Sequence, residues 1–204
     1  MEKPSKHIQP LKNDILIFAT NNQHKVEEIR SVTGGRFNII ALKEAGIDID
    51  IPEPHATIEA NASEKSKTIF RLTKQNCFGE DTGLEVKALH GEPGVKSARY
   101  AGDEKNFEAN IDKLLDKIKA FDDRGAQFKT IISLMWDREE FLFEGIIKGR
   151  ISNKREGSYG FGYDSVFIPE GSDKTFGEME MAEKNLYSHR RKATDKLVEF
   201  LKHK

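Results

Sequence analysis

The chain has 204 residues and a nearly balanced charge, with 33 lysines and arginines against 34 aspartates and glutamates. A formal net charge of -1 excludes the overall basic field that draws a protein to nucleic acid or to an anionic membrane, so any polyanion site must be local. No apolar run approaches membrane-spanning length, and no hydrophobic stretch after Met1 resembles a signal peptide. The single cysteine, Cys77, excludes an internal disulfide and suits a reducing cytoplasm.

Helix and strand patterns alternate along the chain, which predicts an α/β fold with a mixed sheet and two lobes. Residues 1–13 lack periodicity and are expected to form a flexible tail before a single domain at 14–204. Strands are predicted at 15–19, 37–42, 76–79, 84–88, 128–136 and 141–147, and helices after 25, at 57–74, at 107–121, after Thr175 and from Ser188.

A short polar turn follows the first predicted strand. Residues Thr20 to Lys25 separate the apolar run 15–19 from Val26 and Ile29, which are spaced like one face of a helix. Backbone amides at such a helix start, at the positive end of the helix dipole, can bind phosphate oxygens, and Lys25 adds a full positive charge. An ordinary strand-to-helix turn with a solvated lysine is the alternative for this segment taken alone.

Two adjacent carboxylates, Glu80 and Asp81, are predicted to lie in an acidic turn between the short strands at 76–79 and 84–88. Like charges this close raise each other's pKa unless a cation is nearby, and Mg²⁺ typically binds one or two carboxylates together with substrate phosphates. Glu53, on a loop stiffened by a proline on either side, is a candidate second ligand. A solvated acidic turn is the alternative.

The start of the last predicted helix is unusually basic. Ser188 provides the cap, and the run from His189 to Lys192 follows it directly, with Lys184 just upstream. Positive charges in a first helical turn oppose the helix dipole by roughly 0.3–1 kcal/mol each when exposed, so an anion or an electron-rich base edge bound there would offset the cost. A solvated basic patch explains this location less well.

A glycine-flanked aromatic residue precedes a late apolar run. Within Gly160 to Asp164, the glycines allow the backbone to approach a flat ligand closely and Phe161 is placed to stack on it. Asp164 is a candidate acceptor for a ring N–H. A β-bulge with a core phenylalanine is the alternative for a single motif of this kind.

Five segments together resemble the inosine triphosphate pyrophosphatase (Ham1-like) family, whose members remove deaminated purines from the nucleotide pool. The resemblance covers residues 14–200, and the motifs occur in the family's order at Thr20 to Lys25, Glu80 to Leu84, Gly94 to Tyr100, Phe161 to Asp164 and Lys184 to Arg190. It implies an elongated α/β fold, with a central cleft between two lobes, that forms a homodimer. It also implies Mg²⁺-dependent hydrolysis of ITP, dITP or XTP to the monophosphate and pyrophosphate.

The resemblance assigns roles by position. Asp81 matches the catalytic, metal-linked aspartate, Glu53 matches the second metal-site carboxylate, and Thr82 lies beside the substrate. The other substrate-binding residues that it implies are Thr20, Asn21, Asn22, Gln23, His24 and Lys25 for the phosphates, and Phe161, Gly162, Tyr163, Asp164, Lys184, His189 and Arg190 for the base. Cationic donors from Lys184, His189 or Arg190 suit the 6-oxo group of inosine and xanthine and leave adenine unpaired.

Three residues depart from the family pattern: Asn21 replaces a common glycine, Thr82 a common serine and Ser165 a common proline. None of these changes removes a charged group that the chemistry needs. Whether Asp81 acts on the attacking water, holds the metal or does both stays open. A non-catalytic nucleotide-binding protein would be expected to lose Asp81 or Lys25, and a nucleic-acid-binding module would be expected to be basic, so both alternatives fit less well.

Overall fold

The computed structural model describes residues 15–204, so the tail expected at residues 1–13 lies outside the described part of the chain. The strands are β1 Ile15–Phe18, β2 Asn38–Ala41, β3 Cys77–Val86, β4 Pro93–Gly94, β5 Gly125–Trp136, β6 Glu139–Ile151 and β7 Phe167–Pro169. The α-helices are α1 Gln23–Thr33, α2 Ile58–Thr73, α3 Phe107–Ile118, α4 Met181–Lys184 and α5 His189–Leu201. Short 3₁₀ helices are η1 Lys87–Leu89, η2 Ser97–Arg99, η3 Asp164–Val166 and η4 Phe176–Glu178. No helix among these is long and apolar enough to cross a membrane.

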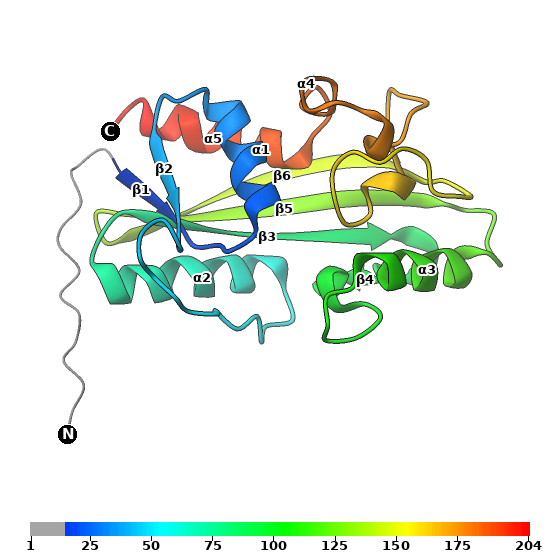
Figure 1. Cartoon of the computed structure of the whole chain (residues 1–204), viewed down its shortest axis with the longest axis horizontal. Helices are drawn as coiled ribbons and strands as arrows, with labels where there is room; N and C mark the ends of the chain where they lie inside the picture. Colours follow the sequence, from blue (N-terminus) through cyan, green and yellow to red (C-terminus); the bar gives the residue numbers. More distant parts are fainter. Residues whose placement is uncertain (1–14) are drawn as a thin grey trace.

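The strands form one mixed seven-stranded sheet, which confirms the predicted α/β class. Its order is β2-β1-β3-β5-β6-β7, with β4 paired to β3 beside this path. β1 runs parallel to β2 and β3, whereas β3, β5, β6 and β7 pair antiparallel. The long strands β3, β5 and β6 extend along the elongated molecule, and the short strands β1 and β2 lie at one end (Figure 1).

Side-chain alternation along β1 shows how helices cover both faces of this end of the sheet. Leu16 and Phe18 pack in a core with residues of α1 and α5, and Ile17 packs on the other side with Ile69 of α2. A separate core at the far end joins α3 to the long strands and to β7. The two ends form the expected two lobes, with β3 and β5 contributing to both.

The acidic turn predicted between 76–79 and 84–88 is wrong, because β3 runs without a break from Cys77 to Val86. Glu80 pairs with Ile132 and Asp81 with Ile131 of β5, in continuous antiparallel register. Successive side chains of a strand point to opposite faces, so the two carboxylates are separated by the backbone. Sequence patterns suggest a turn wherever two charges interrupt an apolar run, but here each charge has its own buried partner.

Side-chain caps begin three of the helices, and the cap predicted at Ser188 is confirmed. The side chains of Asn22, Thr57 and Ser188 each accept the backbone N–H three residues further on and so cap α1, α2 and α5. Thr175 forms a capping box with Glu178 at the start of η4, where a helix was predicted.

The predicted hairpin between β5 and β6 is also confirmed, although its strands are longer than expected. Asp137 and Arg138 alone form the turn, with φ values of 49° and 74°. Positive φ at both central residues produces the tight turn that matches strand twist, so pairing continues to Trp136 and Glu139.

Gly145 of β6 allows α5 to approach the sheet closely, so we expect Gly145→Ala to destabilise the fold. A Cβ there would lie 2.6 Å from the Ala193 nitrogen and would also clash with the His189 carbonyl oxygen, both of them backbone atoms. Overpacking of this kind costs roughly 1–3 kcal/mol. The free energy of unfolding, measured by urea denaturation, should fall by that amount.

Gly125→Ala in β5 is the matched control, because a Cβ there meets only side-chain atoms, the Asp123 carboxylate at 3.0 Å and Lys87 Cδ at 4.0 Å, which can move aside. Equal effects of the two substitutions would show that the contact with α5 does not set the cost.

Candidate active site

A cavity of about 440 Å³ lies where the carboxyl end of β1 meets the edge of β3. β1 pairs with β3 only as far as Phe78, and β4 pairs with it from Leu84, so the edge of β3 between them is open. Every predicted site residue except Gln23 lines this cavity: Thr20, Asn21, Asn22, His24, Lys25, Glu53, Asp81, Thr82, Phe161, Gly162, Tyr163, Asp164, Lys184, His189 and Arg190. Asp81 and Arg190 therefore share one cleft.

The helix start at α1 has the arrangement expected for an anion site. The Asn22 side chain accepts the Lys25 backbone N–H at 3.3 Å, and the N–H groups of Gln23 and His24 have no partner within the helix. Asn21 donates from its side chain to the Ile49 carbonyl at 3.1 Å and adopts no positive φ, so asparagine fits at this family glycine position. The turn before α1 is thus held by Asn22 on the helix side and by Asn21 on the side of the Ile49 loop.

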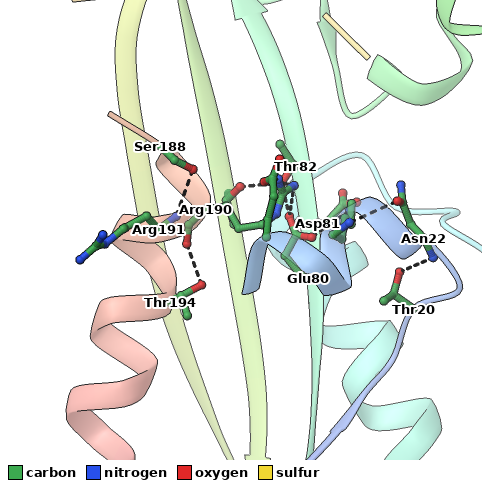
Figure 2. A network of polar contacts seen from close by, with 12 residues as sticks. Thr20, Asn22, Glu80, Asp81, Thr82, Ser188, Arg190, Arg191 and Thr194 are labelled. Carbon is green, nitrogen blue, oxygen red and sulfur yellow. Dashed lines mark hydrogen bonds and ion pairs between the residues drawn. The ribbon is translucent and has the colours of Figure 1, made fainter. Parts of the chain in front are cut away.

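A buried chain of ion pairs lies behind the cavity. It links six side chains of alternating charge in the order Lys25, Glu80, Arg190, Glu28, Lys184 and Asp164. The Lys25–Glu80 and Glu80–Arg190 distances are 3.0 and 3.1 Å. Figure 2 shows Glu80, Asp81 and Thr82 on β3, between Arg190 of α5 and the segment that carries Thr20 and Asn22.

Glu28 completes this chain, and the sequence reasoning missed it. Burial raises the pKa of Glu28, but Arg190 and Lys184 beside it outweigh that effect and lower the pKa to about 2. The Lys184 ammonium lies 2.6 Å from Glu28 and 2.7 Å from Asp164. One signal was present in the sequence: Glu28 directly precedes Ile29 on the apolar face of α1, where a charge needs a partner.

Carboxylates within the protein compensate the positive charge at the start of α5. This corrects the expectation that a bound anion offsets that charge. Arg190 contacts Glu28 and Glu80, both buried carboxylates. Burial favours the neutral form of Glu80, yet Arg190 and Lys25 hold the pKa of Glu80 well below its usual range. Arg191 is partly exposed and pairs with Asp195.

The expectation that His189 is a cationic donor is wrong. Burial, followed by the charge of Arg190, holds the pKa of His189 well below its ordinary value, so the imidazole is neutral at neutral pH. Its ring stacks on Phe128 with 4.6 Å between centroids. Within residues 15–204, His189 Nδ1 and Arg190 Nε are buried nitrogens without a hydrogen-bond partner.

Asp81 lies in a second polar cluster on the α2 side of β3. Lys65 of α2 donates to Asp81 Oδ1 at 2.8 Å and lies 2.6 Å from Glu53, which also pairs with Arg99 at 2.6 Å. Burial raises the pKa of Asp81 and outweighs the opposing effect of Lys65. Burial also acts on Glu53, but Lys65 and Arg99 lower its pKa to about 2.

Lys65 and Arg99 were not assigned a role from the sequence. Lys65 lies between Ala62 and Ile69 on the buried face of α2, so a helical projection would have identified it as a charge needing buried carboxylates. Arg99 belongs to the family motif Gly94 to Tyr100, to whose residues the resemblance assigned no roles.

The loop at the other end of the cavity is fixed by polar contacts. Asp164 accepts the Phe161 backbone N–H at 2.8 Å, and Tyr163 donates its hydroxyl to the Ser97 carbonyl at 2.9 Å. The same Asp164 oxygen, Oδ2, also accepts from Lys184. The Ser165 carbonyl accepts the Glu156 N–H at 2.8 Å, so the loop is held without the family's usual proline.

Comparison with known proteins identifies the family. Residues 16–200 match the Ham1 family. A Porphyromonas gingivalis protein named dITP/XTP pyrophosphatase is 47% identical over 187 residues, covering 91% of this chain and 96% of the relative. A Flavobacterium johnsoniae protein of the same name is 45% identical over 186 residues, covering 91% and 97%. The structure of the Staphylococcus aureus Ham1 protein superimposes with a TM-score of 0.83 at 39% identity and covers 93% of this chain and 98% of that one. This chain belongs to the Ham1 family.

Proposed function

We propose that this chain hydrolyses the nonstandard purine nucleoside triphosphates ITP, dITP and XTP to the monophosphate and pyrophosphate. The observation that carries the proposal is the single cavity that Lys25 and Asp81 share with Phe161 and Arg190. One end has a helix N-terminus and a lysine suited to phosphates, and the other has an aromatic ring and buried cationic donors. The name of its relatives, dITP/XTP pyrophosphatase, describes the same reaction.

The phosphate end is prepared by the sequence from Thr20 to Lys25. The N–H groups of Gln23 and His24 supply hydrogen-bond donors at the positive end of the α1 dipole. Lys25 is held by Glu80 and still lines the cavity, so it contributes charge to a bound triphosphate with little rearrangement.

Mg²⁺ is the proposed cofactor. Among residues 15–204 no three His, Cys, Asp or Glu side chains gather into a metal cluster, but Glu53 and Asp81 contact the same ammonium of Lys65. Two carboxylates placed around one cation fit Mg²⁺, which takes its other ligands from water and phosphates. Bound Mg²⁺ would neutralise charge on the triphosphate.

Asp81 is the proposed catalytic group. Lys65 engages its Oδ1, and within the described residues no hydrogen bond or ion pair involves its Oδ2. Because burial raises the pKa of Asp81, the carboxylate is a stronger base than an exposed aspartate. The free oxygen is thus suited to orient or deprotonate a water molecule for attack on the phosphate chain.

Selection for a 6-oxo purine follows from the donors that the ion-pair chain leaves free. Lys184 uses two of its three N–H donors on Glu28 and Asp164, and Arg190 keeps Nε unpaired among the described residues. These groups match the oxo acceptor of inosine and xanthine. The 6-amino group of adenine would meet donors with another donor, a mismatch that a buried site rejects strongly.

The proposal includes a homodimer in the cytoplasm that acts on small nucleotides, and the resemblance to the family supports the dimer. The presence of a single cysteine suits a reducing compartment, and burial raises the pKa of the Cys77 thiol to about 12. Size-exclusion chromatography with light scattering tests the dimer.

We expect the protein to release pyrophosphate, with no orthophosphate, from ITP, dITP and XTP in the presence of Mg²⁺, and to act poorly on ATP. Asp81→Asn should lower kcat by roughly 10²–10⁴-fold, because it removes the group that orients or deprotonates the water. Pyrophosphate release measured for each nucleotide tests both statements.

Asp116→Asn, at an exposed position of α3, is the matched control and should turn over normally. Turnover retained by a folded Asp81→Asn protein would reject the role of Asp81, and orthophosphate as the product would reject the reaction.

The metal role of Glu53 predicts a changed Mg²⁺ requirement. Glu53→Gln removes one anionic ligand, so the Mg²⁺ concentration for half-maximal ITP hydrolysis should rise by about tenfold or more. A titration of activity against Mg²⁺ measures this, with Glu139→Gln at the exposed start of β6 as control. An unchanged Mg²⁺ requirement in the Glu53 variant would exclude it as a ligand.

Arg190 provides the test of base selection. Truncation to alanine would leave Glu28 and Glu80 buried and unpaired, so Arg190→Lys is the better substitution. Lysine keeps the charge and loses the planar guanidinium with its Nε–H, so the ratio of kcat/KM for ITP over ATP should fall by roughly tenfold. Arg191→Lys, at the partly exposed neighbouring position, should leave the ratio unchanged, and a folded Arg190→Lys protein with the wild-type ratio would exclude Arg190 from base recognition.

A further inference from the structure

The two ends of the cavity touch through a pair of stacked rings. His24, in the first turn of α1, lies against Phe161 with 5.0 Å between ring centroids and 12° between the ring planes. Both residues line the cavity. A residue predicted to hold phosphates is therefore in contact with the ring predicted to hold the base.

This stack leaves no room for a purine between the two rings. Carbon atoms of stacked rings approach to roughly 3.5–4.0 Å, so a base between two rings needs about 7 Å from one plane to the other. The ring centroids of His24 and Phe161 are only 5.0 Å apart, so the spacing between the two ring planes is too small for that arrangement. A base can lie on this face of Phe161 only after His24 has left it.

The cationic donors at the base end favour a purine beside Phe161. Lys184 Nζ and Arg190 Cζ lie 5.5 and 5.6 Å from the centre of the Phe161 ring. A base whose oxo group reaches these donors is thereby placed against the ring. His24 lines the same cavity as Phe161 and these two donors.

His24 is the ring that can move. Its side chain is exposed, and it makes no hydrogen bond or ion pair to any residue in 15–204. Phe161 is held more firmly. Asp164 accepts its backbone N–H, and its ring also lies against Phe107, with 6.1 Å between ring centroids. The only described interaction that holds the imidazole is the stack itself.

We propose that His24 occupies the stacking place of the purine until a base binds and that the incoming base displaces it. This inference rests on the proposed function and adds a residue that opposes base binding from the phosphate side. The imidazole shields the apolar face of Phe161 from water until a stronger stacking partner replaces it. The free-energy cost of displacing His24 is the same for every purine, because it does not depend on the groups at the edge of the base.

Removal of the imidazole should strengthen base binding. We expect His24→Ala to lower the Kd of IMP by about two- to tenfold, the range of an aromatic pair, and to change the Kd of XMP by the same factor. His24→Phe, which stacks on Phe161 with a more apolar ring, should weaken IMP binding. Isothermal titration calorimetry with IMP, XMP and tripolyphosphate measures these effects, and the affinity for tripolyphosphate should not rise in His24→Ala.

His203→Ala, at an exposed position after α5, is the control and should bind all three ligands as the wild type does. IMP binding that is unchanged or weaker in His24→Ala would overturn the proposal, and weaker binding would instead indicate a second wall that closes over the base. A loss of tripolyphosphate affinity without a gain for IMP would assign His24 to the phosphates. Wild-type protein that neither binds IMP nor hydrolyses ITP would overturn the proposed function itself.

Discussion

The buried chain of alternating charges from Lys25 to Asp164 is the interaction on which the site depends. Its six side chains come from α1, β3, α5, α4 and η3, so it fixes elements of both lobes relative to one another. All of these side chains except the partly exposed Lys25 are buried and paired, and removing one member of such a buried pair typically costs about 3–5 kcal/mol. Residues at the cavity wall are therefore held in place before a ligand arrives, which is the condition for electrostatic preorganisation.

The geometry of β3 gives two adjacent carboxylates different surroundings, because their side chains point to opposite faces of the strand. Glu80 faces Arg190 and Lys25, where low pKa and full burial suit a permanent structural charge. Asp81 faces Lys65, where burial raises its pKa and Oδ2 has no hydrogen bond or ion pair among the described residues. Both are near the cavity because β1 ends before it reaches them and leaves the edge of β3 open. The same two residues in a turn would have repelled each other and required a shared cation.

Local chemistry made much of the fold predictable. Caps at Asn22, Thr57 and Ser188 and the apolar stripes that follow them indicate helices wherever the same residues occur. The acidic turn failed because strand prediction relies on apolar alternation, which Glu80 and Asp81 interrupt. Lys65 and Glu28 were missed for the same reason, because a charge on a buried face is interpreted as solvated unless its partner is known. The carboxylates that pair with Lys65 are 12 and 16 residues away, and the cations that pair with Glu28 are 156 and 162 residues away.

The sequence by itself determined the alternation of strands and helices, the polar turn from Thr20 to Lys25 that begins α1, and the order of motifs that places the chain in its family. Those features depend on neighbours within a few residues, or on patterns that can be compared directly. Only the tertiary structure decided which charges are partners, that His189 is neutral, and that His24 stacks on Phe161. Such properties depend on desolvation and on distances between segments far apart in the chain, and both are fixed only when the sheet and its helices pack together.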